Sequence, residues 1–223
     1  MTIKIYADPG SGSCRRVNAV IKHLDIDVEE IFIDLLAGEN RTENFLEINR
    51  TGMVPVMVIE DGNQEKIIIS EAAAIMVYLC EQYGDTELLS NGDSRMQILK
   101  WMFWAAEHFR QPAPLYFEEK VIAPLMGNEE NISRLEEADR LIETHATILN
   151  AHLENRKYVV GDNVTLADFD LAAALSQMPR SKVPYDKYEN IMRWAIDLES
   201  NVDAWRITGE ALNKRMNIAL SNN

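Results

Sequence analysis

The residues best suited to chemistry lie near the start of the chain, in the segment 9–17. Ser11, Ser13 and Cys14 stand there between an apolar run and a helical pattern of apolar residues. The first backbone N–H groups of a helix have no partner within it, and the helix dipole is positive at that end. The start of a helix therefore stabilises an anion or a thiolate. We expect Ser11 or Ser13 to lie where such an anion or thiolate binds. A plain helix cap is an alternative interpretation of the same residues.

The chain has two cysteines, Cys14 and Cys80. Neither belongs to a CxxC pair or to a Cys/His cluster with zinc-ligand spacing, so a disulfide framework and a structural metal are disfavoured. Ser11 and Cys14 have the spacing of a redox CxxC motif whose first, exposed cysteine has become serine. We therefore expect Cys14 to be a buried core residue that does not exchange disulfides.

Composition and charge narrow the class of protein. The 223 residues are 47 % hydrophobic and 26 % charged, and they suffice for one large domain or two smaller ones. No apolar run reaches the roughly 18 residues of a membrane span, and the N-terminus lacks the apolar region of a signal peptide. We expect a cytoplasmic protein without a membrane partner. The net charge of −14 disfavours nucleic acid as a partner.

The elements that must position these residues alternate along residues 1–83. Apolar runs predict strands, helical spacing predicts helices, and Asp61-Gly62-Asn63 predicts a hairpin turn. The order is βαβαββα, which describes a small mixed sheet with helices on both faces. The expected strands are 3–6, 28–33, 54–59 and 66–69, and the expected helices are 15–24, 42–48 and 71–83.

Residues 84–94 are rich in Gly, Asp, Asn and Ser, which predicts an interdomain linker. The patterns beyond it are helical, so residues 95–223 are expected to form an all-α domain. The expected helices there are 95–109, 131–153, 166–177 and 191–198.

Motifs in this order resemble those of the glutathione S-transferases, in which a thioredoxin-like domain (here 1–83) precedes an all-helical domain. The resemblance covers nearly the whole chain, and its first motif is similar to the active-site loop of bacterial, serine-type, theta- and delta-like members. The motifs are Pro9-Gly10-Ser11 with Cys14-Arg15, Met53-Val54-Pro55, Glu71 with Ala74, Ile75, Tyr78 and Leu79, and Gly161 with Thr165-Leu166-Ala167-Asp168.

The resemblance implies a transferase that conjugates the thiolate of glutathione, its co-substrate, to a small hydrophobic electrophile without a metal. Ser11 would donate a hydrogen bond to the sulfur, with Ser13 as the alternative donor. No histidine lies near Ser11 in the sequence to act as a base, so a covalent nucleophile is not expected.

The resemblance also implies where glutathione binds. A cis bond between Val54 and Pro55 would turn the Val54 backbone toward the cysteine moiety of glutathione, where it would pair as a strand does. Glu71 would bind the γ-glutamyl end, although its place at a helix start also fits a dipole partner.

The chain departs from the family pattern at three positions where the family binds glutathione. Ala72 replaces a serine, Asn40 stands where delta-like enzymes have a histidine, and Met53 stands where many relatives have a lysine. Each change removes a donor or a positive charge, so we expect weakened glutathione affinity.

In the second domain, Thr165 and Asp168 have the spacing of a capping box, which is a structural role. The electrophile is expected between the domains, at Trp104, His108 and Tyr116. Trp104 and His108 are one helical turn apart and share a face, although an aromatic stripe also fits a helix core.

Two other functions fit the same fold, because function belongs to the site. One is a non-catalytic ligand- or protein-binding module, which Ala72 and Met53 favour and which Ser11, Glu71 and Val54 oppose. The other is a glutathione-dependent reductase or peroxidase. The resemblance further implies a homodimer and a role in detoxification.

Overall fold

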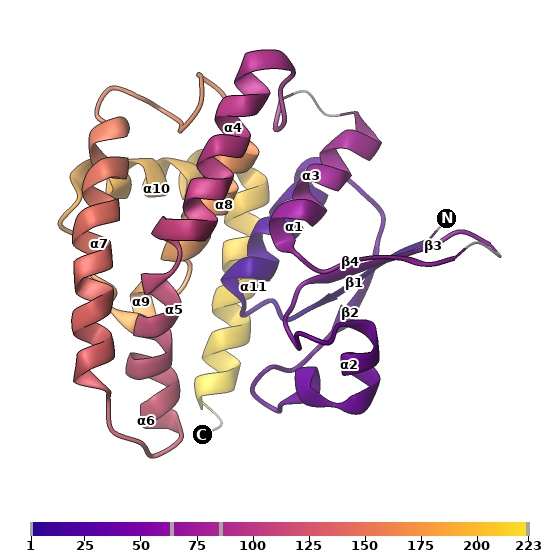
Figure 1. Cartoon of the computed structure of the whole chain (residues 1–223), viewed down its shortest axis with the longest axis horizontal. Coiled ribbons are helices and arrows are strands. Elements are labelled where there is room, and N and C mark those ends of the chain that lie inside the picture. The colour runs from indigo at the N-terminus through magenta and orange to yellow at the C-terminus, as the bar shows by residue number, and fades with distance from the viewer. Residues whose placement is uncertain (1, 63–64, 85–86, 222–223) are drawn as a thin grey trace. The chain divides into compact units, whose positions relative to one another are not determined.

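The computed structural model describes residues 2–62, 65–84 and 87–221 (Figure 1). The chain divides into two compact units, one formed by Met1–Asp85 with Ile207–Asn223 and the other by Thr86–Arg206. The end of the chain therefore belongs with the first unit, whereas the sequence patterns place it in the helical domain. Asn63 of the predicted turn and residues 85–86 of the predicted linker lie outside the described residues.

The first unit contains a four-stranded sheet in the order β2-β1-β3-β4. β1 is parallel to β2 and antiparallel to β3, and β3 is antiparallel to β4. The sheet and its helices follow the predicted βαβαββα order, so the thioredoxin-like fold class is confirmed. The strands are β1 (Thr2–Ala7), β2 (Glu29–Phe32), β3 (Val56–Glu60) and β4 (Ile67–Ile69).

Helices cover both faces of this sheet (Figure 1). α1 (Gly12–His23) and α3 (Ala72–Tyr83) pack against each other on one face, and α2 (Glu43–Ile48) lies on the other after the short 3-10 helix η1 (Glu39–Arg41). β3 is the most buried strand, since four of its five residues are buried. α1 begins before its predicted start, since Ser11 caps it.

The second unit is helical, as predicted, and the predicted helices correspond to α4 with η2, α7, α8 with η4, and α10. The sequence patterns did not predict α5, α6, α9 or α11. Among the described residues, no helix is long and apolar enough to span a membrane. The elements of this unit are α4 (Gly92–Trp104), the π-helical η2 (Ala105–Phe109), α5 (Pro112–Phe117), the π-helical η3 (Glu118–Ile122), α6 (Ala123–Leu125), α7 (Ile132–His152), α8 (Leu166–Ala172), the 3-10 helix η4 (Ala173–Leu175), α9 (Met178–Ser181) and α10 (Glu189–Asn201). The last helix, α11 (Asp203–Ser221), begins in this unit and belongs to the first unit from Ile207 onward.

Part of the predicted linker packs inside the second unit. Leu88 and Leu89 are buried, and the Leu88 carbonyl accepts the Leu166 N–H at 2.9 Å. The polar composition of this segment predicted a linker, but burying its two leucines removes apolar surface from water and favours packing.

The buried carboxylate of Asp168 joins three parts of the second unit. It accepts hydrogen bonds at 2.9 Å from the Val159 N–H, the Thr165 N–H and hydroxyl, and the Trp194 Nε1–H. The predicted capping box is therefore confirmed. Asp168 also holds α10 and the 153–165 segment, so its role extends beyond the cap.

Asp168→Ala is expected to lower the free energy of unfolding by about 3 kcal/mol, because buried donors lose their acceptor. Denaturant unfolding measures this loss, and Asp162→Ala, which changes an exposed aspartate nearby, should have little effect. The activity that the resemblance implies should persist at temperatures where the variant is folded. An unchanged melting temperature with lost activity would contradict the structural role.

Candidate functional site

The strand register brings the C-terminal ends of β1, β2 and β4 and the start of β3 to one edge of the sheet. Tyr6 pairs with Val56, so the end of β1 lies beside the start of β3. Met57 pairs with Ile69, so the end of β4 lies there too. Because β2 is parallel to β1, its end reaches the same edge.

The predicted glutathione contacts follow or precede these strand ends. Ser11 follows β1, Pro55 precedes β3, and Ala72 follows β4. α1 and α3 therefore both begin at this edge, and their dipoles place positive potential there. Such an edge suits an anionic ligand.

Ser11 is the N-cap of α1. Its Oγ accepts a hydrogen bond from the Cys14 N–H at 3.4 Å, and its own N–H donates to the Asp8 carbonyl at 2.9 Å. The cap interpretation is thus confirmed. A serine hydroxyl both accepts and donates, so the cap leaves the hydroxyl hydrogen for a ligand. Ser11 is half-buried, and so is Ser13 in the first turn of α1.

Cys14 points into the core. It is fully buried, and desolvation raises the pKa of its thiol to about 12. Cys80 is also buried, and neither cysteine forms a disulfide. The prediction that Cys14 is a core residue is confirmed.

The Val54–Pro55 peptide bond is cis, as predicted. Val54 is buried, whereas the Met53 side chain is 60 % exposed. The Met53 carbonyl accepts a hydrogen bond from Asn49 Nδ2 at 2.8 Å, and this bond fixes the backbone before the cis-proline. The Met53 side chain brings no charge to the edge.

Asn40 supports the same segment. Its Nδ2 donates to the Gly52 carbonyl at 2.7 Å, so the side chain ties η1 to the turn before Pro55. Gly52 has φ +65°, a backbone conformation that favours glycine. The structure gives Asn40 this structural bond, and its contact with glutathione stays a prediction.

Glu71 precedes the first residue of α3. Its side chain is exposed and makes no cap hydrogen bond, so its carboxylate is open to a ligand. Ala72 is 3 % exposed at the helix start. A methyl group therefore occupies the position where a hydroxyl would reach the same edge.

Asp8 is a site residue that the sequence motifs did not indicate. It is 3 % exposed, and its carboxylate accepts the Gly10 N–H at 2.8 Å and the Leu35 N–H at 3.2 Å. It thereby fixes the loop that leads to Ser11. A polar residue directly after a strand was the only local signal.

In the second unit, Trp104 and His108 lie in one aromatic cluster. The Trp104 ring stacks on Phe109 with centroids 5.8 Å apart and lies 6.1 Å from His108, whose ring is 5.1 Å from His145. Burial, together with His108, lowers the pKa of His145. Trp104 is half-buried and His108 is exposed, so both retain accessible surface.

Tyr116 has a different environment from the one expected. It is 7 % exposed, and its hydroxyl donates to Asp139 on α7. Burial and the neighbouring carboxylate raise its pKa. These contacts join α5 to α7, so the structure gives Tyr116 a packing role, and substrate contact is not supported by its burial.

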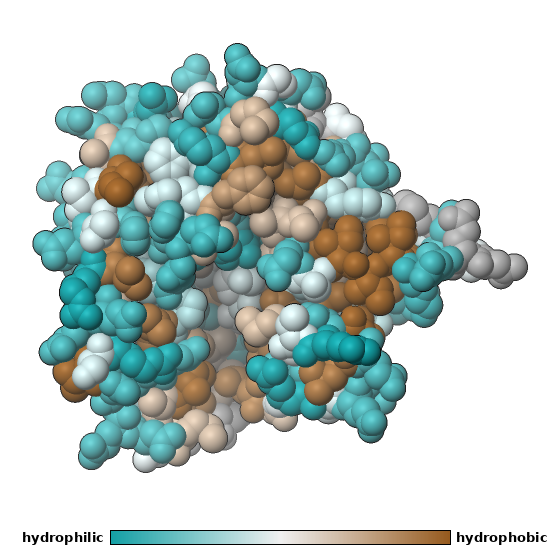
Figure 2. Space-filling view, viewed as in Figure 1, coloured by the Kyte–Doolittle hydropathy of each residue, from teal (hydrophilic) through white to brown (hydrophobic). Residues whose placement is uncertain are grey.

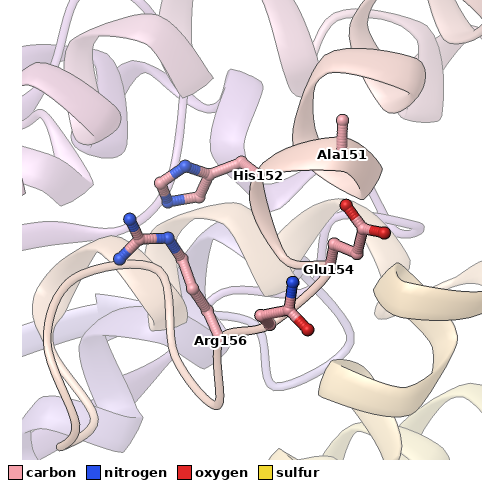
Figure 3. A pocket seen from close by; sticks show the side chains of 5 residues that line it. Ala151, His152, Glu154 and Arg156 are labelled. Atoms are coloured by element: carbon pink, nitrogen blue, oxygen red, sulfur yellow. The ribbon is translucent and has the colours of Figure 1, made fainter.

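A pocket of about 500 Å³ lies at the end of α7 (Figure 3) and contains none of the predicted site residues. The His152 ring and the Arg156 guanidinium point toward each other there. His152 Nε2 lies 2.8 Å from the Val159 carbonyl, which can only accept, and burial lowers the pKa of this histidine. In the ranges described, no group of three or more His, Cys, Asp or Glu side chains is placed to hold a metal. The pocket is lined by Ala151, His152, Glu154, Asn155 and Arg156.

A thioredoxin-like unit with a cis-proline edge, followed by a helical unit, is the architecture of a glutathione transferase. Residues 10–82 match the family model "Glutathione S-transferase, N-terminal domain", and residues 113–200 match "Glutathione S-transferase, C-terminal domain". The chain belongs to the glutathione S-transferase family, and the predicted enzyme class, a glutathione transferase, is confirmed.

Relatives and solved structures agree with this. The chain is 29 % identical to a glutathione S-transferase of Hyoscyamus muticus over 89 % of this chain and 93 % of that protein. It is 30 % identical to glutathione S-transferase 3 of Zea mays over 74 % and 73 %. Glutathione transferase F7 from Populus trichocarpa has a TM-score of 0.82 at 23 % identity, covering 95 % of this chain and 100 % of that one. These relatives are plant proteins, so the predicted bacterial, theta- or delta-like subgroup is not supported.

The buried cysteines give a prediction about absorbance. Because burial raises the pKa of Cys14 to about 12, thiolate absorbance of the protein alone should stay flat as the pH rises through neutrality. Denatured protein is the control, and it should titrate near pH 8.5. A thiolate signal near neutrality in the folded protein alone would contradict this.

Proposed function

We propose that the protein conjugates the thiolate of glutathione to small hydrophobic electrophiles, with Ser11 as the donor to the sulfur. The observation that carries this is the Ser11 hydroxyl at the N-terminus of α1, which accepts the Cys14 N–H and keeps its hydrogen. The thiol proton leaves to solvent. The sulfur lone pair then forms the bond to carbon, and the leaving group departs with its bonding electrons.

The energies are adequate for this role. Lowering a thiol pKa from about 8.5 to about 7 requires about 2 kcal/mol of preferential stabilisation of the thiolate. A hydrogen bond to an anion supplies about 1.5–3 kcal/mol, and a helix N-terminus adds about 0.3–1 kcal/mol. Ser13 is the alternative donor, because it lies in the first turn of the same helix.

Glutathione would lie along the edge where α1 and α3 begin. The backbone of Val54 beside Pro55 would pair with its cysteine moiety, and the exposed Glu71 carboxylate would bind the γ-amino group. A family member from Pseudomonas fluorescens, with a TM-score of 0.81 and 17 % identity, has a structure described with two glutathione bound. Ala72, Met53 and Asn40 leave this chain with fewer donors than the family pattern has.

The accessible aromatic surface of Trp104 and His108 supports these two as the contacts for an apolar electrophile. A homodimer is supported by apolar side chains gathered around the edge strand β4 (Figure 2), where Ile67 and Ile68 are 49 % and 47 % exposed. The serine-type mechanism is proposed on Ser11 alone, and the cytoplasmic location stays a prediction.

A reductase or peroxidase that works through a protein thiol is less well supported. Ser11 stands where a redox CxxC motif has its attacking cysteine, and both cysteines of this chain are buried. A non-catalytic binding module would instead show neither thiolate formation nor turnover when glutathione is bound.

Ser11→Ala should raise the apparent pKa of bound glutathione by about one to two units, because the thiolate loses a donor. Thiolate absorbance against pH at saturating glutathione measures it. Ser13→Ala is the matched control and should keep the wild-type value. An unchanged pKa in Ser11→Ala would exclude Ser11, and a raised pKa in the control would transfer the role to Ser13.

Ala72→Ser should strengthen glutathione binding about tenfold, because it places a hydroxyl donor at the start of α3. Calorimetric titration with glutathione measures the Kd. Ala73→Ser, on the next residue of the helix, is the matched control. Equal affinity in both variants and wild type would show that the missing hydroxyl does not limit binding.

A further inference from the structure

One arginine of the last helix, α11, forms ion pairs with the segment that leads to Ser11. Arg215 Nε lies 3.2 Å from Asp8 Oδ1, and its Nη2 lies 3.3 Å from Asp8 Oδ2, so the guanidinium holds both carboxylate oxygens. Nη2 also donates to Asp34 Oδ1 at 2.6 Å. The guanidinium lies over the Phe32 ring, 5.1 Å from its centroid. Arg215 is therefore held in one orientation by contacts with two carboxylates and a ring.

Asp8 connects Arg215 to the loop 8–11, which leads into α1. One carboxylate oxygen accepts the Gly10 N–H and the other accepts the Leu35 N–H, while the Asp8 carbonyl accepts the Ser11 N–H. Asp8 is 3 % exposed, and a buried carboxylate that loses its cation is strongly unfavourable. Arg215 thus provides the charge that keeps Asp8, and with it the loop, in place.

The backbone of the loop also packs directly on α11. A Cβ at Gly10 would lie 2.8 Å from Met216 Sδ and 3.2 Å from Arg215 Cγ. No space separates the loop from the helix at this point. A loop that moved would have to displace these side chains.

We infer that Arg215 is a positioning residue for the transferase reaction, which holds the Ser11 hydroxyl where the glutathione sulfur binds. The inference rests on the proposed role of Ser11. Arg215 acts through Asp8 and the Gly10 backbone and does not contact the sulfur.

The test compares Arg215→Ala and Arg215→Lys with the matched control Lys214→Ala, which removes one positive charge from an exposed neighbour on α11. Arg215→Ala should raise the apparent pKa of bound glutathione by about one unit and lower kcat/KM at neutral pH about tenfold. Arg215→Lys should lie between it and wild type, because lysine keeps the charge without the planar fork. Lys214→Ala should match wild type in both measurements.

A double-mutant cycle separates positioning from general stability. If Arg215 acts through the hydroxyl, Ser11→Ala with Arg215→Ala should have the same thiol pKa as Ser11→Ala alone. Additive shifts would overturn the inference. All variants are measured below their melting temperatures, and if Arg215→Ala does not fold, the pKa in Arg215→Lys decides.

The outcomes distinguish the two proposals. If Ser11→Ala leaves the thiol pKa unchanged, the proposed role of Ser11 fails, and this inference fails with it. If Ser11→Ala raises the pKa while folded Arg215→Ala and Arg215→Lys keep the wild-type value, the role of Ser11 stands and only the inference about Arg215 is overturned.

Discussion

The directions in which β1 pairs with its two neighbours decide where the proposed glutathione-binding residues of the first unit lie. Because β1 is parallel to β2 and antiparallel to β3, two strand ends and one strand start meet at one edge. β4 adds its own end there, since it is antiparallel to β3. A slip of one residue would turn every side chain of a strand to the other face, so the alternating burial of β1 makes this register the stable one. The core thereby fixes the site.

Electrostatics explain why the helix starts matter in this chain. The net charge of −14 opposes an anionic ligand, so local donors must overcome the overall field. α1 and α3 begin at the shared edge, and their first N–H groups supply such donors without any basic side chain. The alanine at 72 and the methionine at 53 contribute none, so in the proposed mechanism the Ser11 hydroxyl would supply a larger share of the thiolate stabilisation.

Local patterns predicted the first unit well because its strands are short apolar runs separated by turn residues. The cis bond at Pro55 needed the family resemblance, since few X-Pro bonds are cis. The hydrogen bond of Tyr116 could not be predicted from the sequence for a tertiary reason. Its partner Asp139 lies on α7, and no spacing within α5 indicates that contact.

Arg215 and Asp8 show the same limit at longer range. An ion pair between opposite ends of a chain has no local signature, and the sequence patterns did not even predict α11. Burial makes the pair necessary, because Asp8 is bonded to two backbone N–H groups and to a guanidinium while almost fully removed from water. The strands of the thioredoxin-like sheet therefore end at residue 69, whereas the loop after β1 also contacts a residue near the end of the chain, which belongs to the same compact unit.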